Sequence, residues 1–177
     1  MIVKKVMHKL YSCYKTNKIC MKNVLLNYVG GSFICPMWLR RLIYRFYGHQ
    51  ISTVYANCFL GYGLGKLKVG KGSYCNSRCF FDLGNNITIG ENCCVAFGVT
   101  FINSTHRIGD KYKRGGVGIT KSIFIGDGCW IGANVTILPG IEIGTGCIIG
   151  AGALVTKNCK PNGLYVGVPA KRIRDLE

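Results

Sequence analysis

An aliphatic residue recurs every six positions along the second half of the chain. From residue 125 onward an Ile or Val leads six consecutive hexads, and Gly follows the leading residue in four of them. The leading residues are Ile125, Ile131, Ile137, Ile143, Ile149 and Val155. Chance would place six aliphatic residues in register in about one case in 4,000 for this composition. The period therefore predicts short strands separated by glycine-rich turns, as in a β-solenoid.

The same register extends upstream with one irregularity. The upstream leading residues are Val69, Cys75, Phe81, Ile89, Val95 and Phe101, with a two-residue slip around 84–86. A second apolar or small residue recurs two places before the leading position, at Leu67, Cys79, Ile87, Cys93, Val99, Ile123, Cys129, Val135, Ile141, Cys147 and Ala153. Residues two apart in an extended segment face the same side. Each hexad is therefore expected to bury one large and one small residue.

The cysteines fit this packing scheme. Five of the eleven occupy the small inward position: Cys79, Cys93, Cys129, Cys147 and Cys159. The odd number and the adjacent pair Cys93–Cys94 disfavour a disulfide framework, and the chain has no CxxC motif for a zinc ribbon. We therefore expect reduced thiols that pack in the core, a cytoplasmic protein, and no metal site.

The repeat is interrupted once, at 103–118. This polar stretch contains four Lys and Arg side chains and the Gly115–Gly116 pair. A regular solenoid usually extrudes a loop for a functional reason. His106 lies at the start of the loop, and the other histidines, His8 and His49, are too far away in sequence to suggest a three-histidine zinc site.

Residues 1–50 lie outside the repeat and are strongly basic. All seven acidic residues lie at or after Asp82, the first 81 residues contain thirteen Lys and Arg, and the formal net charge is +16. Two stretches have helical periodicity with cations alongside the apolar residues. They are Val3, Val6, Met7, Leu10 and Tyr14, and Trp38, Leu39, Leu42, Ile43 and Phe46 with Arg40, Arg41 and Arg45. Such helices either cap the open end of a solenoid or lie on an anionic membrane surface.

Other partners and a membrane span are disfavoured. The uncharged stretch 23–39 contains Asn, Gly, Ser and Pro residues, so we do not expect it to span a bilayer. No aromatic RNA-binding motif accompanies the positive charge, so nucleic acid is not an expected partner.

Together, the hexads and the C-terminal sequence from Ile149 to Glu177 resemble the hexapeptide-repeat acyltransferases. The resemblance covers about 60% of the chain, from Val69 to Leu176, and is greatest to the maltose and galactoside O-acetyltransferases and to capsule, O-antigen and colanic-acid acetyltransferases. It implies an all-β fold, a left-handed parallel β-helix with three hexads per coil. The expected division is a helical basic segment at 1–50 and a repeat domain at 51–177 with an extruded loop at 103–118.

The resemblance also implies roles for individual residues. His106 matches the general base of the family, seventeen residues after Ile89, and Asn76 matches the Asn that holds the acceptor. The matching positions for acetyl-CoA are Trp130, Ala133, Ala151, Thr156, Lys157, Lys171 and Arg174. The Ala residues would offer backbone groups to the pantetheine arm, and the cations would lie near the phosphates.

The implied activity is acetyl transfer from acetyl-CoA to a sugar or glycan hydroxyl by direct attack, in a homotrimer. The acceptor is expected to be anionic or lipid-linked, and the enzyme to work in the cytoplasm or at the inner face of the membrane. An N-acetyltransferase or another acyltransferase on the same fold is one alternative, and a non-catalytic β-helix scaffold is a second.

Overall fold

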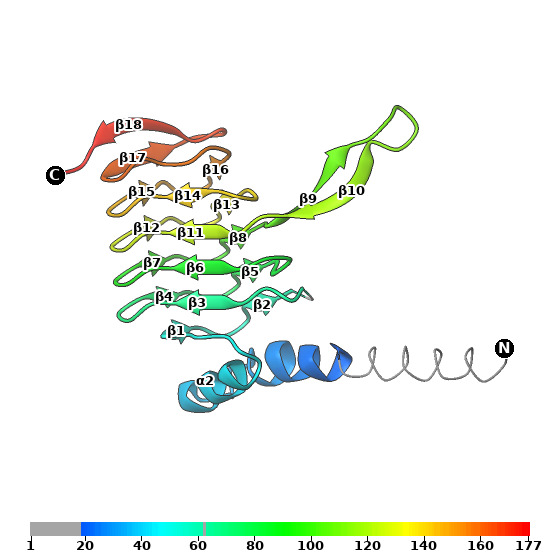
Figure 1. Ribbon diagram of the computed structural model, residues 1–177. Helices are drawn as coiled ribbons and strands as arrows, with labels where there is room; N and C mark the ends of the chain where they lie inside the picture. The colour runs from blue at the N-terminus through cyan, green and yellow to red at the C-terminus, as the bar shows by residue number, and fades with distance from the viewer. Residues whose placement is uncertain (1–18, 62) are drawn as a thin grey trace.

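Strands of mostly two or three residues stack into three sheets, which are parallel except for the last strand, β18 (Lys171–Asp175), and form the walls of a β-solenoid (Figure 1). The computed structural model describes residues 19–61 and 63–177. Sheet I contains β3 (Leu67–Val69), β6 (Ile87–Ile89), β11 (Ile123–Ile125) and β14 (Glu142–Ile143). Sheet II contains β1 (Thr53–Val54), β4 (Tyr74–Cys75), β7 (Cys94–Val95), β12 (Trp130–Ile131), β15 (Ile148–Ile149), β17 (Gly163–Val166) and β18 (Lys171–Asp175). Sheet III contains β2 (Phe59–Leu60), β5 (Phe80–Phe81), β8 (Thr100–Phe101), β13 (Thr136–Ile137) and β16 (Leu154–Val155).

Within each coil the chain passes from sheet I to sheet II to sheet III and then rises to sheet I of the next coil. After β3, β4 and β5, for example, β6 pairs in parallel with β3, with Leu67 opposite Ile87. We call the corners of this prism the I–II, II–III and III–I edges. The architecture is a parallel β-helix, as the hexads predict. It agrees with the left-handed form that the family resemblance implies.

The core confirms the two inward positions of each hexad. Every leading residue and every second residue named from the sequence is at most 5% exposed. Large aromatic rings also stack from coil to coil, since the Phe81 and Phe101 ring centroids are 5.0 Å apart with an interplanar angle of 11°. The repeat therefore builds a continuous apolar column along the solenoid.

The inward cysteines are buried, as the packing interpretation predicts, and their thiols also form hydrogen bonds. Each of several thiols donates to a carbonyl at a corner of the next coil, at sulfur–oxygen distances of 3.1–3.3 Å. The pairs are Cys58 with Asn76, Cys79 with Ala96, Cys93 with Gly126, Cys129 with Gly144, and Cys147 with Lys160. One of these bonds is buried and the other four are partly buried, so the thiols have a polar role that the sequence pattern alone did not indicate.

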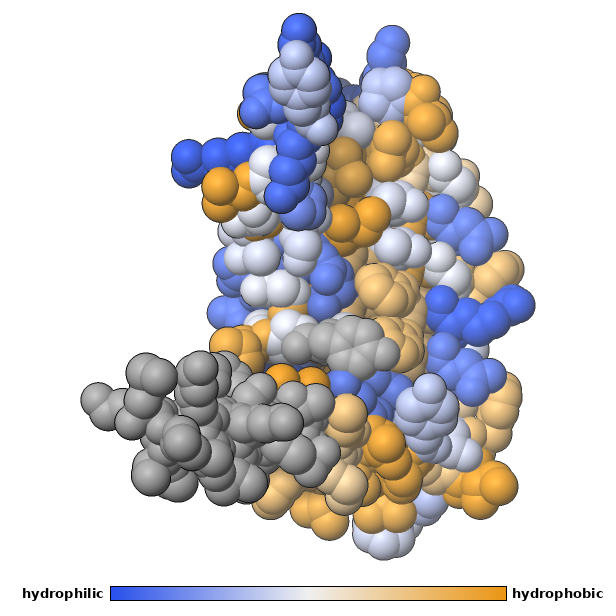
Figure 2. All heavy atoms as spheres, turned by 90° about the vertical axis from the view of Figure 1, so that its right-hand side faces the viewer, coloured by the Kyte–Doolittle hydropathy of each residue, from blue (hydrophilic) through white to orange (hydrophobic). Residues whose placement is uncertain are grey.

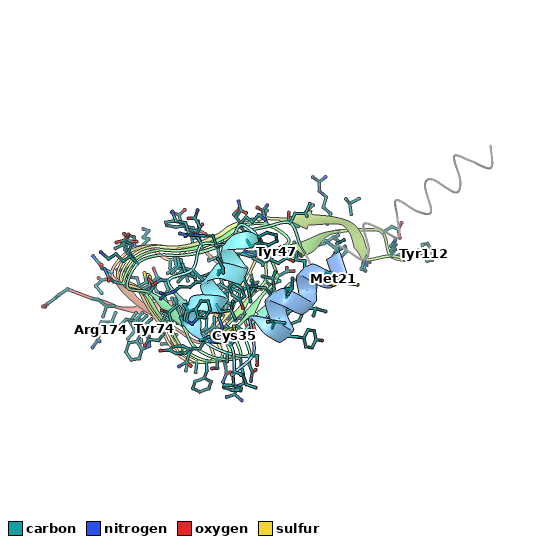
Figure 3. The ribbon with its side chains drawn as sticks, turned by 90° about the horizontal axis from the view of Figure 1, so that it is seen from below. Met21, Cys35, Tyr47, Tyr74, Tyr112 and Arg174 are labelled. Atoms are coloured by element: carbon teal, nitrogen blue, oxygen red, sulfur yellow. The ribbon has the colours of Figure 1, made fainter. Side chains whose placement is uncertain are left out.

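A helical cap closes the lower end of the solenoid (Figure 1). It comprises helical residues 19–23, the π-helix η1 (Val24–Val29), the connection at 30–36 and α2 (Met37–Phe46). Seen from below in Figure 3, η1 and α2 lie side by side across the end of the coils. The amphipathic stretch expected at residues 3–14 lies outside the described residues.

The orientation of α2 differs from the one expected from its sequence. Arg40 is buried, whereas Trp38, Leu42 and Phe46 of the expected apolar face are exposed. The guanidinium of Arg40 donates to the carbonyl oxygens of Val54 and Ser32, both at 2.7 Å, and to those of Gly30 and Cys35. Three of these carbonyls, those of Gly30, Ser32 and Cys35, lie in the non-helical backbone between η1 and α2 and have no helical partners. One guanidinium with five N–H donors satisfies them and also reaches the first coil.

The upper end is closed by the antiparallel pair β17–β18. Arg172 of β18 donates to the carbonyl oxygens of Lys160, Pro161 and Asn162 and contacts Asp175. At each end of the solenoid, therefore, one arginine side chain donates hydrogen bonds to several backbone carbonyl oxygens. Within residues 19–61 and 63–177, no helix is long and apolar enough to cross a membrane.

Candidate active site

The interruption of the repeat is a β-hairpin that leaves the III–I edge directly after β8. Its strands are β9 (Ser104–Ile108) and β10 (Gly115–Thr120), which pair antiparallel with His106 opposite Gly118. In Figure 1 the hairpin projects away from the stacked coils. It places an imidazole outside the solenoid, where a second molecule can reach it.

The imidazole of His106 has a fixed orientation. Its Nδ1 atom lies 2.9 Å from the carbonyl oxygen of Gly116 on the opposite strand of the hairpin. A carbonyl oxygen can only accept, so Nδ1 is the protonated nitrogen and donates to it. The second nitrogen, Nε2, therefore has its lone pair free, which is the state that a general base requires.

Polar side chains anchor the root of the hairpin to the coil below. The Oδ2 atom of Asp82 accepts hydrogen bonds from the backbone amides of Asn103 at 3.1 Å and Ser104 at 2.7 Å. The backbone carbonyl of Asn85 accepts a hydrogen bond from the side-chain amide of Asn103. The side-chain amide of Asn85 donates a hydrogen bond to the hydroxyl of Thr120. Both strands of the hairpin are thus tied to residues 82–86, the segment in which the hexad register slips.

The partners of His106 and of the hairpin root were not predicted from the sequence. Asp110, the nearest acid in sequence, accepts instead from the backbone amides of Tyr112 and Lys113 at the tip of the hairpin. The two-residue slip of the hexad register at 84–86 was the one sequence signal for the root of the hairpin. A local break in a regular repeat often marks an anchoring contact.

The structure divides the sequence-predicted site residues between two edges of the prism. Asn76 directly follows β4, at the II–III edge, whereas His106 leaves from the III–I edge. Asn76 is partly exposed, and its Oδ1 atom accepts a hydrogen bond from the amide of Ser77. Within one chain, therefore, the base and the acceptor residue expected from the resemblance lie on different edges.

The expected acetyl-CoA residues are divided in the same way. Trp130 lies in β12 of sheet II with 56% of its surface exposed, and Ala133 and Ala151 follow on the II–III edge. Thr156 and Lys157 follow β16, so they lie on the III–I edge, above the hairpin.

The remaining pair, Lys171 and Arg174, lies in β18, the last strand of sheet II at the upper end. Both side chains are exposed, and Figure 3 shows Arg174 on the side of the molecule opposite Tyr112 of the hairpin. The two cations can therefore face a ligand that runs along sheet II, but not one held by the hairpin of the same chain.

The II–III edge offers backbone donors that a ligand can use. The carbonyl oxygen of Ala133 accepts from the amide of Gly152 at 2.8 Å, which joins two successive corners. Among the described residues, the amides of Ala133 and Ala151 donate to no protein acceptor. Free N–H groups one coil apart beside an exposed Trp suit an extended ligand that has amide carbonyls.

The thiols of Cys75 and Cys159 are poor nucleophiles. Burial raises the pKa of the Cys75 thiol well above its usual value and raises that of Cys159 to about 12. A thiol acts as a nucleophile only as the thiolate. In the part of the chain that the structure describes, no cluster of three His, Cys, Asp or Glu side chains is arranged to hold a metal ion.

A parallel β-helix of hexapeptide coils with one extruded, histidine-bearing hairpin defines the class of hexapeptide-repeat transferases. The bacterial transferase hexapeptide (six repeats) family matches residues 122–157. A maltose O-acetyltransferase from Clostridium difficile 630 superposes with a TM-score of 0.75, at 31% identity over 91% of this chain and 86% of that one. A galactoside acetyltransferase in complex with coenzyme A superposes with a TM-score of 0.72, at 28% identity over 90% of this chain and 82% of that one. The chain belongs to the hexapeptide-repeat acetyltransferase family.

Sequence relatives agree with this assignment. A Schizosaccharomyces pombe protein with an acetyltransferase name is 44% identical over 108 residues, which are 61% of this chain and 52% of that protein. The chain spans about half the length of the first curated relatives that it matches.

Proposed function

We propose that the protein is an acetyl-CoA-dependent O-acetyltransferase that acetylates a hydroxyl group of a sugar or glycan precursor. The observation that carries the proposal is the orientation of His106, whose Nε2 lone pair is left free by the hydrogen bond from Nδ1 to Gly116. The likeness to a maltose O-acetyltransferase and to a galactoside acetyltransferase with bound coenzyme A supports the acceptor and the donor.

In the proposed reaction, Nε2 of His106 takes the proton of the acceptor hydroxyl as its oxygen attacks the thioester carbonyl. The resulting tetrahedral oxyanion accepts a hydrogen bond from a backbone amide of the solenoid. Collapse breaks the carbon–sulfur bond, and the imidazolium returns its proton to the departing thiolate of coenzyme A. No acyl-enzyme forms, so the reaction needs no cysteine nucleophile.

Acetyl-CoA is proposed to lie along sheet II and its edge with sheet III. Trp130 would contact the cofactor, and the free amides of Ala133 and Ala151 would donate to the pantetheine carbonyls. Lys171 and Arg174 would neutralise the phosphates. Thr156 and Lys157 would contribute to the acetyl-CoA site at the III–I edge, near the hairpin.

This division between two edges supports a homotrimer. A ring of three copies with head-to-tail contacts brings the II–III edge of one copy against the III–I edge of the next. His106 of one copy would then face Asn76 and the sheet II residues of its neighbour. Each active site would be complete only between two subunits.

Calorimetric titration of the protein with acetyl-CoA tests the donor half of the proposal. We expect one site per chain and weaker binding in Trp130→Ala and Lys171→Glu. Lys68→Glu is the matched control, because Lys68 is an exposed cation of sheet I. Absence of binding at millimolar acetyl-CoA would contradict the proposal.

Mass spectrometry of a sugar panel with [acetyl-¹³C]-acetyl-CoA tests the acceptor half. We expect acetylation of hydroxyl acceptors and a loss of kcat of about 10²-fold or more in His106→Asn. Acetylation of amino sugars alone would favour the N-acetyltransferase alternative. Acetyl-CoA binding without transfer to any acceptor would favour a non-catalytic scaffold. Cytoplasmic localisation belongs to the same proposal, because acetyl-CoA and reducing conditions are found there.

A further inference from the structure

The helical cap exposes many large apolar side chains. Those that are more than half exposed are Met21, Tyr28, Phe33, Ile34, Trp38, Leu42 and Phe46. We call this set the apolar cap face. Figure 2 shows hydrophobic residues gathered at the lower end of the molecule, where the cap lies. Single exposed apolar residues are ordinary, whereas a cluster on one small element marks an interaction surface.

The position of Arg40 explains why this face is exposed. Arg40 and Tyr44 occupy the buried side of α2, so the helix turns its other side to the solvent. Trp38, Leu42 and Arg45 follow one another at spacings of four and three residues, which places them on one side of the helix. The exposed side of α2 therefore alternates bulky apolar groups with cations.

A pocket of about 560 Å³ lies between α2 and the first coils. Its cationic lining consists of Arg41 and Arg45 from the helix and Lys71 from the turn after β3. Trp38 and Leu42 of the apolar cap face form part of the same wall. None of the lining residues is acidic, and the sequence has no acidic residue before Asp82.

The pocket therefore favours an anionic group that arrives together with an apolar surface. A phosphate ester suits two guanidinium groups and one ammonium group. A free small anion would explain the cations but not the neighbouring Trp38, Leu42 and Phe46. A second copy of the cap docked symmetrically would bring the Arg41 and Arg45 side chains of both copies together without a carboxylate between them.

We infer that the apolar cap face docks on the surface of a bilayer that contains anionic phospholipid. Its apolar side chains enter the boundary between headgroups and acyl chains, and Arg41, Arg45 and Lys71 hold a lipid phosphate. The protein lies on the membrane in this arrangement and does not span it. The inference concerns the cap alone and does not depend on acetyl transfer.

Docking through the cap also bears on the acceptor. The hairpin leaves after β8, in the third coil above the cap, and coils are about 4.8 Å apart. His106 therefore starts about 10–15 Å above the first coil, and the helices of the cap add about 10 Å between that coil and the bilayer. A lipid-linked acceptor would have to extend its reacting sugar over this height from the membrane. This consequence for a lipid-linked acceptor rests on the proposed function, whereas the docking itself does not.

Flotation of the full chain with vesicles tests the inference. The vesicles contain phosphatidylcholine alone or phosphatidylcholine with about one third phosphatidylglycerol. We expect binding to the anionic vesicles only, weakened as salt is raised. Arg45→Glu is expected to weaken binding at least about fivefold, whereas Arg107→Glu, the same charge change on the hairpin, leaves it nearly unchanged. Trp38→Ala with Phe46→Ala is expected to reduce binding at least about tenfold.

Circular dichroism and the molar mass in solution show whether each variant is folded and assembled. No binding of the wild type to anionic vesicles at low salt overturns the inference. Equal losses in Arg45→Glu and Arg107→Glu also overturn it, because they indicate attraction by net charge alone. A lower oligomeric mass in Trp38→Ala with Phe46→Ala would show that the face lies between copies of this chain. None of these readouts uses acetyl transfer, so failure of docking is distinguishable from failure of the proposed function.

Discussion

The Nδ1 atom of His106 lies 2.9 Å from the carbonyl oxygen of Gly116. The other described histidine has the reverse arrangement, because Nδ1 of His49 accepts a hydrogen bond from the amide of Leu67 at 3.0 Å. In its neutral form, His106 is therefore protonated on Nδ1 and His49 on Nε2. Two rings in one chain with opposite tautomers provide an internal comparison.

We expect ¹⁵N–¹H correlation spectra at about pH 8.5, where imidazoles are in general neutral, to show both tautomers. The signals are assigned by their loss in His106→Gln and His49→Asn. A His106 ring protonated on Nε2 would contradict the hydrogen bond to Gly116 and with it the proposed base.

The second prediction concerns Asp82, which holds the amides of Asn103 and Ser104 at the root of the hairpin. Asp82→Ala leaves both amides without this acceptor and should lower the free energy of unfolding by about 1–3 kcal/mol. Hydrogen exchange across residues 104–120 should accelerate, and kcat should fall while the affinity for acetyl-CoA stays constant. Asp82→Asn keeps an acceptor oxygen and should behave closer to the wild type. Unchanged exchange in Asp82→Ala would show that the hairpin is held by other contacts.

The third prediction compares two glycines. A Cβ atom on Gly132 would lie 2.6 Å from the nitrogen of Ala151 and 2.8 Å from the oxygen of Ile149, both in the backbone of the next coil. Gly132→Ala should therefore push two coils apart and lower the free energy of unfolding by about 2–3 kcal/mol. Gly115→Ala meets nothing within 4 Å and should change it by less than about 0.5 kcal/mol. Urea denaturation of both variants measures the difference, and similar values would contradict close contact between the coils at Gly132.

The fourth prediction follows from His49, which is fully buried. Burial, with the nearby cations Lys22 and Lys66, lowers the pKa of His49 from 6.5 to about 4. Between these values the unfolded chain binds a proton that the folded chain does not. The free energy of unfolding should therefore fall as the pH is lowered through this range, and level off below about pH 4.

From pH 7 to pH 5 the contribution of His49 is about 2 kcal/mol. The variant His49→Asn keeps an acceptor for the Leu67 amide but does not titrate. Urea denaturation of wild type and variant should diverge as the pH falls, with the wild type losing more. Parallel pH profiles would show that His49 is not the group responsible.

The buried column was predictable because it depends only on periodicity. Ile125 is buried because it leads a hexad, and Cys129 is buried because it lies two positions before the next leading residue, Ile131. Both positions follow from the six-residue period and from the alternation of sides along a strand, whatever the neighbouring coils contain. The residue Arg40 was misjudged because the amphipathic interpretation assumes that cations face water. That assumption fails where a guanidinium serves open carbonyls.

The site was predictable in part. The position of His106 in an interrupted repeat pointed to the hairpin, but the approach of Gly116 depends on strand pairing, which is irregular between Gly115 and Gly118. Periodicity of six does not say on which edge of the prism a residue lies; three hexads per coil and the slip at 84–86 decide that. Asn76 and His106 therefore look like one site along the sequence but lie on separate edges of the structure.

The cap and the hairpin root also settle a question that a repeat cannot answer by itself. Every interior hexad offers nearly the same two side chains, so a coil shifted by one full turn would bury a similar column. Only the non-repeating contacts distinguish the observed register of the coils from a shifted one. Arg40 reaches Val54 in the first coil, and Asn85 meets Thr120 and Asn103 across the single insertion. These non-repeating residues therefore fix the register of the solenoid. They determine which hexads form the first coil and which hexad follows the hairpin.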